Sequence, residues 1–237
     1  MMKILMLHGS RQSGELFKAK IQAIEKLTKQ ALNSDVEFVY PTAPFALEPL
    51  GEVSELRDRH GTWRWFQSES FESLNQGLEK SLDLIASVLE TSGPFDGIVG
   101  FSQGAALAVM VAAILETDRG AEFRRLEAEG GMPYPTSLTN SGHPPLKFVV
   151  AISGYKASHP AYQAFYEPPI MTPSLHFIGG MDTVVDEATS LRLVDCCLGT
   201  TDEAKASVIR HPGAHVIPSG KRQLVGIVQF IKSCMVA

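Results

Sequence analysis

Runs of consecutive apolar residues alternate with stretches of helical periodicity from one end of the chain to the other. Such continuous runs are typical of strands buried on both faces of a parallel sheet. They predict strands at 3–7, 36–40, 97–101, 147–152, 174–178 and 206–210. Apolar residues at helical spacing predict helices at 16–32, at 71–89, from 105 onwards, and at about 221–233. We therefore predict an α/β fold, with one domain over residues 1–237 and a mainly parallel sheet of about six strands between two layers of helices.

Two segments interrupt this alternation, at 41–70 and at 117–145. The first holds bulky aromatic residues without periodicity, and the second begins with charged residues and continues through glycines and prolines. Long irregular segments inside a compact α/β domain are usually functional or disordered. The second segment has two interpretations at this point, a lid over a binding pocket or a solvated surface insertion.

The charge balance limits the classes of partner. The chain carries 21 Lys and Arg against 26 Asp and Glu, a formal net charge of −5. Nucleic acids and anionic membrane surfaces require a cationic patch, whereas the basic residues here are scattered. The apolar run near the first residue is too short for a signal peptide, and no run has the length of a membrane span. We therefore expect no nucleic-acid partner and no membrane span.

Three cysteines make a poor disulfide framework. Two of them, Cys196 and Cys197, are adjacent, which suits a reducing compartment and predicts a cytoplasmic location. The third, Cys234, opens a final Cys-Met-Val-Ala that formally fits a prenylation pattern. No polybasic stretch precedes it, and one prenyl chain anchors weakly without a second signal. We favour the simpler interpretation, a last helix that ends near a cysteine.

The candidate chemistry begins at the pentapeptide Gly-Phe-Ser-Gln-Gly, residues 100–104, which joins a predicted strand to a predicted helix. Ser102 would stand at the apex of a sharp turn, in a strained backbone conformation. Gly100 and Gly104 remove side chains that would collide where the strand and the helix nearly touch. Such a turn lifts the hydroxyl above the edge of the sheet, so we predict that Ser102 is a nucleophile.

A serine nucleophile needs a base within hydrogen-bond reach and a third group that orients the base. In a parallel sheet these groups should follow strands, in the chain order acid and then histidine. Asp182 follows a strand in a glycine turn, whereas Asp186 suits the start of a helix. His211 abuts the last strand, and His215 lies beyond a glycine-containing turn that can carry its ring to the serine. The predicted triad is Ser102, Asp182 and His215.

Acyl transfer also needs N–H donors for the oxyanion. One should come from Gln103, the residue after the nucleophile. The second should come from the turn after the first strand, where Ser10 is the candidate and Arg11 is the alternative. The other histidines lack the spacing of a metal site, so neither a metal nor a cofactor is expected.

Several short motifs together resemble one family, the family serine hydrolase (FSH) group of small α/β-hydrolases, which is common in fungi and has an animal relative. They lie at 7–9 with 12 and 14, and at 40–45, 63–66, 95–105, 152–155, 180–185 and 211–218. The resemblance implies an α/β-hydrolase fold, and it carries the family's triad onto Ser102, Asp182 and His215. Ala214 replaces a usual second glycine and Ser10 a bulkier residue. The change at Ala214 makes the turn slightly less free but does not threaten the site.

The irregular segments should supply the walls of an acyl pocket. The candidates are Trp63, Trp65, Phe66, Phe101 and Tyr155. Core packing is the commoner fate of any one aromatic residue, but as a set beside a nucleophile they favour an apolar pocket.

The resemblance implies a serine acyl hydrolase that acts on a small-molecule ester or thioester. Some members of the family resemble polyketide-pathway thioesterases, so an acyl-carrier protein is a candidate partner, with a role in secondary metabolism. Others resemble carboxylesterases for short or medium acyl esters. A ligand-binding module on a hydrolase fold is the alternative of a different class. The sequence determines neither the acyl group nor the oligomeric state.

Overall fold

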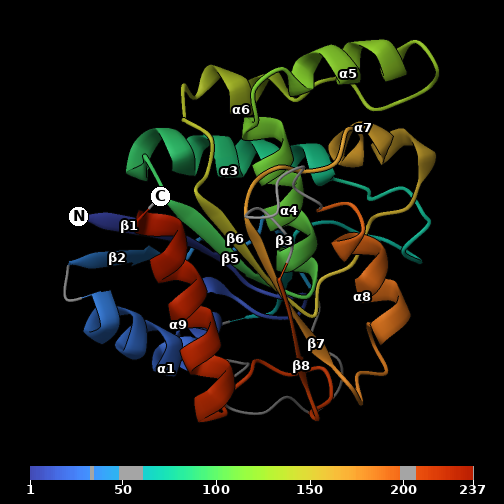
Figure 1. Cartoon of the computed structure of the whole chain (residues 1–237). Helices are drawn as coiled ribbons and strands as arrows, with labels where there is room; N and C mark the ends of the chain where they lie inside the picture. Colours follow the sequence, from blue (N-terminus) through green and yellow to red (C-terminus); the bar gives the residue numbers. More distant parts are fainter. Residues whose placement is uncertain (33–34, 48–60, 198–206, 237) are drawn as a thin grey trace.

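The computed structural model describes residues 1–32, 35–47, 61–197 and 207–236, and its centre is a six-stranded parallel sheet (Figure 1). The strands differ from the predicted ones by no more than one residue at either end. In chain order they are β1 (Met2–Leu7), β2 (Val36–Val39), β5 (Gly97–Phe101), β6 (Phe148–Ile152), β7 (Ser174–Gly179) and β8 (Ser207–His211). The predicted α/β fold with a parallel sheet is confirmed.

The strand order across the sheet positions the site. That order is β2-β1-β5-β6-β7-β8, so the chain reverses its direction across the sheet between β1 and β5. In open parallel sheets, ligands bind outside the carboxyl ends of the strands at such a reversal. Leu7 at the end of β1 pairs with Gly100 near the end of β5. The loops that follow these two strands therefore start side by side.

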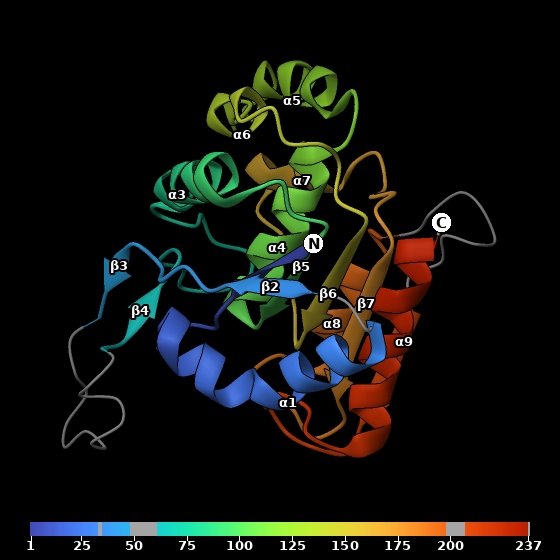
Figure 2. The ribbon, with the colours of Figure 1, turned by 90° about the vertical axis from the view of Figure 1, so that its left-hand side faces the viewer.

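Helices cover both faces of the sheet, as predicted (Figure 2). On one face lie α1 (Gly14–Leu32) and α9 (Lys221–Val236), and on the other lie α3 (Leu78–Ser92), α4 (Gln103–Leu115) and α8 (Glu187–Val194). The two helices of the first face each turn one apolar stripe to the sheet, because apolar residues recur at helical spacing. The stripes are formed by Phe17, Ile21 and Ile24 and by Leu224, Ile227 and Ile231.

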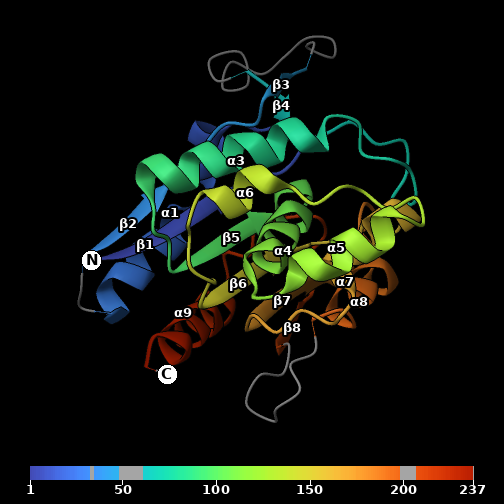
Figure 3. The same ribbon diagram turned by 90° about the horizontal axis from the view of Figure 1, so that it is seen from above.

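All thirteen residues of α4 are buried, because further helices cover its outer side. These are α5 (Arg119–Glu127), α6 (Thr136–Asn140) and α7 (Gln163–Tyr166), the last of which follows the 3-10 turn η1 (Pro160–Tyr162) (Figures 1 and 3). Phe123, Leu126 and Leu138 belong to the same apolar cluster as α4. The segment 117–145 is thus a layer packed on α4. Whether it acts as a lid or as a surface insertion stays a prediction.

The helix predicted at 71–89 begins later, at Leu78. The preceding residues are held in a loop, because the backbones of Gln67 and Gln76 exchange two hydrogen bonds of 2.9 and 2.8 Å. Gly77 then enters the helix at φ 82°, where a Cβ atom would lie 2.4 Å from the Phe45 ring. Within the predicted irregular segment, β3 (Phe45–Ala46) and β4 (Trp63–Arg64) form a small antiparallel pair.

None of the helices in the described ranges is long and apolar enough to cross a membrane. The three cysteines are unpaired. Cys234 lies within α9, where it is half-buried against the cluster under α1 and α9. Burial raises the pKa of its thiol. The last helix thus ends near this cysteine, as the favoured interpretation states, and the fold does not test prenylation.

Candidate active site

Ser102 sits between β5 and α4 with φ 53° and ψ −119°, a conformation that non-glycine residues rarely adopt. The turn is tight on both sides of the serine. A Cβ atom on Gly100 would lie 2.4 Å from the Gly104 carbonyl oxygen, and one on Gly104 would lie 2.3 Å from the Leu7 carbonyl oxygen. Because only glycine fits both positions, the chain can pass directly from strand to helix with the serine at the apex, as the pentapeptide predicted.

The structure brings together the three side chains predicted for the triad. His215 Nε2 lies 2.9 Å from Ser102 Oγ, and His215 Nδ1 lies 2.7 Å from Asp182 Oδ2. An ionised carboxylate only accepts hydrogen bonds, so Nδ1 carries the proton that Asp182 accepts. In the neutral ring Nε2 is then an acceptor, and the Ser102 hydroxyl donates to it. This is the arrangement in which a histidine can take the serine proton.

Asp182 is held by its own turn. Its Oδ1 atom accepts hydrogen bonds from the backbone N–H groups of Val184, at 2.9 Å, and Val185, at 2.8 Å. Burial opposes the charged form of this carboxyl, but the hydrogen bonds from Val185, from the His215 ring and from Val184 outweigh it and hold the pKa below its ordinary value. The carboxylate is therefore ionised and fixed in orientation near neutral pH.

The two rejected candidates have other contacts. Asp186 caps α8, since its carboxylate accepts the Thr189 N–H at 2.8 Å. His211 is the last residue of β8, and its Nδ1 accepts the Gly213 N–H at 3.2 Å. Burial lowers the pKa of His211, against the opposing effect of the Asp182 charge. His211 thus braces the turn that carries His215, while His215 itself reaches the serine.

The two backbone N–H groups predicted to bind an oxyanion, those of Gln103 and Ser10, belong to segments that adjoin Ser102. The Ala105 and Ala106 N–H groups donate to the Ser102 carbonyl, whereas the Gln103 N–H precedes them in the first turn of α4. On the other side a Cβ atom on Gly9 would lie 3.3 Å from Ser102 Cβ, so the loop after β1 passes against the serine. In that loop the Arg11 N–H donates to the Trp63 carbonyl at 2.8 Å. Because that N–H is occupied, the geometry favours Ser10 over Arg11 as a second donor.

The side chain of Gln103 has a further role that sequence reasoning missed. Its Oε1 atom accepts the Trp65 N–H at 2.8 Å, and its Nε2 atom donates to the Phe66 carbonyl at 2.8 Å. The buried amide therefore ties the loop at 65–66 to the serine turn. Trp65 Nε1 donates in addition to the His8 carbonyl at 2.8 Å. We call these two hydrogen bonds of the Gln103 side chain the Gln103 bracket. No signal in the sequence distinguishes a glutamine that forms them from an ordinary polar residue after Ser102.

The predicted pocket walls need correction. Trp65 and Phe66 expose 0% of their surface and belong to the core cluster under α3 and α4, so they are not walls of an open pocket. Tyr155 is also buried, with its ring centroid 4.5 Å from that of Phe71. Burial raises the pKa of Tyr155 well above its ordinary value, against a hydrogen bond with the Gln103 side chain. The Gln103 bracket accounts for the burial of Trp65 and Phe66, since it holds their backbone against the serine turn.

A hollow of about 290 Å³ adjoins His215. Its described walls are Gln12, Lys20, Phe101, His215, Val216 and Ile217. Of the predicted pocket residues only Phe101 is among them; neither Trp63 nor any residue of 117–145 is. The Phe101 ring lies 5.0 Å from the His215 ring, centroid to centroid. Val216 and Ile217 directly follow His215 in the sequence, which is a signal that could have identified them. Nothing in the sequence links Lys20 on α1 to the site.

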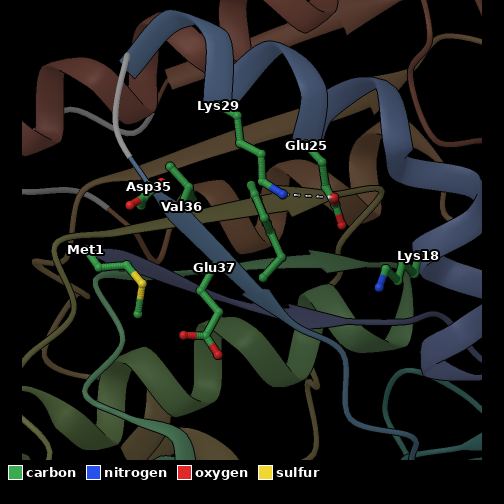
Figure 4. A pocket seen from close by; sticks show the side chains of 8 residues that line it. Met1, Lys18, Glu25, Lys29, Asp35, Val36 and Glu37 are labelled. Atoms are coloured by element: carbon green, nitrogen blue, oxygen red, sulfur yellow. Dashed lines mark ion pairs between the residues drawn. The ribbon is translucent and has the colours of Figure 1, made fainter.

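A larger hollow of about 570 Å³ lies along the edge strand β2 (Figure 4). It carries Lys29, whose ammonium is 3.8 Å from the Glu25 carboxylate and 5.4 Å from the centre of the Phe38 ring. Met1 and Val36 also line it, so it opens at the amino ends of the strands, away from Ser102. The part of the chain that the structure describes contains no cluster of three or more metal-ligating side chains.

The parallel sheet, the serine turn and the residues gathered after β5, β7 and β8 define an α/β-hydrolase. A solved relative of this fold, acyl-protein thioesterase 2 from Zea mays, superposes with a TM-score of 0.58 at 18% identity, over 99% of this chain and 94% of that one. The serine hydrolase (FSH1) family model matches residues 1–227. The chain belongs to this family.

Two curated relatives illustrate its range. Esterase OVCA2 of Danio rerio is 30% identical over 250 residues, which cover 98% of this chain and 96% of that protein. A Schizosaccharomyces pombe protein named dihydrofolate reductase is 32% identical over 243 residues, 98% of this chain. The chain spans only 47% of that longer protein.

Proposed function

We propose that this protein is a serine acyl hydrolase that cleaves an ester or a thioester through an acyl-enzyme on Ser102. One observation carries the proposal, the continuous hydrogen-bond chain from Ser102 Oγ through both ring nitrogens of His215 to Asp182. A serine hydroxyl is a weak nucleophile alone, and such a chain is what activates it. A ligand-binding module would not need this chain, so its presence favours an enzyme.

In the proposed mechanism, His215 Nε2 takes the Ser102 proton as Oγ attacks the carbonyl carbon of the substrate. The N–H groups of Gln103 and Ser10 donate to the oxyanion. When the intermediate collapses, His215 gives the proton to the leaving oxygen or sulfur, and the acyl group stays on Ser102. Water then attacks the acyl-enzyme, His215 takes its proton and returns it to Oγ, and the acid leaves. Asp182 orients the ring and stabilises its cationic form throughout.

For the substrate, we propose a thioester whose acyl or polyketide chain is released from an acyl-carrier protein in the cytoplasm. The family resemblance supports this, and so does the fold shared with a protein titled acyl-protein thioesterase. The second candidate, a carboxylesterase for short or medium esters, is favoured by the size of the hollow beside His215. At about 290 Å³ it is at the lower end of small-molecule pockets and leaves little room for a long chain on that side.

Steady-state kinetics on matched acyl thioesters and oxoesters, from short to long chains, test this function. The histidines supply a matched pair of variants. We expect His215→Ala to lower kcat by about 10³-fold or more, because it removes the base. His211→Ala should retain most of the turnover, because His211 only braces the turn. If His211→Ala abolished turnover and His215→Ala did not, the assignment of the base would be wrong. Turnover of short oxoesters without thioester cleavage would favour the second candidate.

A further inference from the structure

His8, which directly follows β1 and begins the loop that carries Ser10, is fully buried and takes no part in the proposed mechanism. Both of its ring nitrogens are held. Nε2 accepts the Ala43 N–H at 3.0 Å, and Nδ1 lies 2.7 Å from the Gly9 carbonyl oxygen. The Trp65 ring lies against the imidazole, with the two ring centroids 5.1 Å apart. These contacts give the His8 ring a single orientation.

The two contacts of the ring also fix its tautomer. A nitrogen that accepts an N–H carries no proton, so Nε2 is the unprotonated nitrogen of the His8 ring. Burial lowers the pKa of His8 to about 4, against the smaller opposing effect of its hydrogen bond with Gly9, so the ring is neutral near neutral pH. A neutral imidazole keeps one proton, and that proton must be on Nδ1. The Nδ1–H therefore donates to the Gly9 carbonyl.

The direction of the Gly9 carbonyl decides the direction of the next N–H group. The Gly9–Ser10 peptide bond is trans, since the two cis bonds in the described part of the chain both precede prolines. In a planar trans peptide the C=O and the N–H point in opposite directions. Because His8 holds the Gly9 carbonyl on the buried side, the Ser10 N–H is turned to the opposite side. Gly9 is buried and Ser10 is exposed, which agrees with this direction.

The loop also holds the other polar group of Gly9. Its N–H donates to Gln12 Oε1 at 3.3 Å, so side chains hold this residue at both its N–H and its carbonyl. Within the described ranges no acceptor for the Ser10 N–H is found, so this donor is available to a ligand. A Cβ atom built on Gly9 would lie 3.3 Å from Ser102 Cβ, so the backbone passes against the serine. The loop therefore presents the Ser10 N–H close to Ser102.

We propose that His8 is a positioning residue, whose Nδ1–H holds the Gly9 carbonyl and thereby aims the Ser10 N–H at the oxyanion that forms when Ser102 attacks. The inference rests on the proposed acyl transfer and deepens it, because it names the group that sets the second oxyanion donor in place. A donor that is oriented before the substrate arrives needs no reorganisation during the reaction, which is why such N–H groups are effective. His8 acts through the peptide bond and needs no contact with the substrate.

Two amide side chains separate the two contacts of the imidazole. The Nδ2 atom of asparagine is as many bonds from Cβ as Nδ1, so His8→Asn keeps a donor for the Gly9 carbonyl and loses the acceptor of the Ala43 N–H. The Oε1 atom of glutamine is as many bonds from Cβ as Nε2, so His8→Gln keeps that acceptor and loses the donor. Each variant leaves one buried backbone group without its partner, so we expect comparable falls of the urea midpoint.

His143 supplies a matched control at the other end of the strands. Its Nδ1 lies 2.7 Å from the carbonyl oxygen of the next residue, Pro144, and its Nε2 accepts the Phe95 N–H at 2.6 Å, the same pair of contacts that His8 makes. Phe95 precedes β5, so these contacts lie at the amino ends of the strands, away from Ser102. His143→Gln should therefore lower the urea midpoint but leave kcat within about twofold of the wild type.

For each variant we would measure kcat and KM on S-butyryl N-acetylcysteamine and the inhibition constant of pentyl trifluoromethyl ketone. The ketone forms a hemiketal on Ser102, whose oxyanion meets the same N–H groups although no leaving group departs. In His8→Gln we expect kcat to fall about 10-fold to 100-fold, less than for a donor removed outright, with KM within about threefold. The inhibition constant should rise by a similar factor. In His8→Asn all three values should stay within about threefold of the wild type.

The inference would be overturned by unchanged kcat in His8→Gln, by equal losses of kcat in His8→Gln and His8→Asn, or by an equal loss in His143→Gln. A fall of kcat in His8→Gln without a rise of the inhibition constant would overturn it as well. If His8→Gln does not fold, NMR spectra of the wild type decide. The ring proton of His8 must be on Nδ1, and the Ser10 amide proton must move downfield when the ketone binds; either failure overturns the inference. The proposed acyl transfer fails separately, if the wild type cleaves none of the esters and thioesters.

Discussion

Replacement of Asp182 by asparagine tests the hydrogen-bond chain at its buried end. The Val184 and Val185 N–H groups both point at Oδ1, so the asparagine oxygen must stay there to accept them. The NH₂ group then takes the place of Oδ2, 2.7 Å from His215 Nδ1. Two donors cannot face each other, so the imidazole must give up its Nδ1 proton and carry one on Nε2 instead.

With Nε2 protonated, the ring donates to Ser102 Oγ and can no longer take its proton. We therefore expect kcat to fall by about 10⁴-fold in Asp182→Asn, the size known for a wrong histidine tautomer in such a triad. This corresponds to about 5 kcal/mol of transition-state stabilisation. The fold should survive, because both backbone donors keep an acceptor. We expect the free energy of unfolding to fall by only about 1–2 kcal/mol.

Initial rates on a short-chain thioester give kcat, and urea unfolding curves on the same preparation give the free energy of unfolding. Asp182→Ala is the companion variant, since it leaves the two N–H groups without their acceptor and should cost more stability than Asp182→Asn. The reasoning would be refuted if Asp182→Asn kept a tenth or more of the wild-type kcat. A loss of activity with unfolding at room temperature would refute the claim that the amide replaces the carboxylate in its turn.

Three further predictions concern the surroundings of the site and the core. Burial lowers the pKa of His176 from 6.5 to about 4, so the folded protein binds fewer protons than the unfolded chain between these values. Because of His176, the free energy of unfolding should fall by about 3 kcal/mol as the pH falls from 6.5 to 4. In His176→Gln, urea unfolding curves recorded over this pH range should show a fall that is smaller by this amount. Gly104→Ala forces a Cβ atom to within 2.3 Å of the Leu7 carbonyl oxygen. It should lower the free energy of unfolding, measured by thermal unfolding, by about 3 kcal/mol or more. Gly130→Ala should lower it by only about 1 kcal/mol, because there only the positive φ is unfavourable. Equal losses in the two variants would contradict the tight turn. Gln103→Leu leaves the Trp65 N–H and the Phe66 carbonyl without the partners they have at 2.8 Å. It should lower the free energy of unfolding by about 2–4 kcal/mol, and a variant as stable as the wild type in urea would exclude the bracket.

The central sheet was predictable because buried parallel strands carry continuous apolar runs, a signal that does not depend on distant contacts. The serine turn was predictable for a similar reason. Local geometry requires Gly100 and Gly104, and both lie within the same five consecutive residues as the serine, so the motif can be recognised without knowledge of distant contacts. His215 followed from chain order and from the glycine turn before it, since a residue directly on the strand, such as His211, is held near the sheet.

The parts that could not be predicted depend on tertiary contacts. The start of α3 at Leu78 is set by backbone hydrogen bonds across the preceding loop, not by its apolar spacing. Trp65 and Phe66 are large aromatic residues of the kind that line apolar pockets, but hydrogen bonds from the Gln103 amide hold their backbone in the core. Lys20 reaches the hollow from a helix whose periodicity identifies only its buried stripe. Nothing in the sequence distinguishes this exposed lysine from the other exposed lysines of the helix.

Labelling with a fluorophosphonate probe, followed by peptide mapping, tests the central claim most directly, because such probes react with an activated serine whatever its acyl substrate. We predict one adduct on Ser102 in the wild-type protein, its loss in Ser102→Ala, and much slower labelling in His215→Ala at unchanged stability. Absence of labelling in the wild type, or an adduct that persists in Ser102→Ala, would contradict the account of this protein as a serine acyl hydrolase.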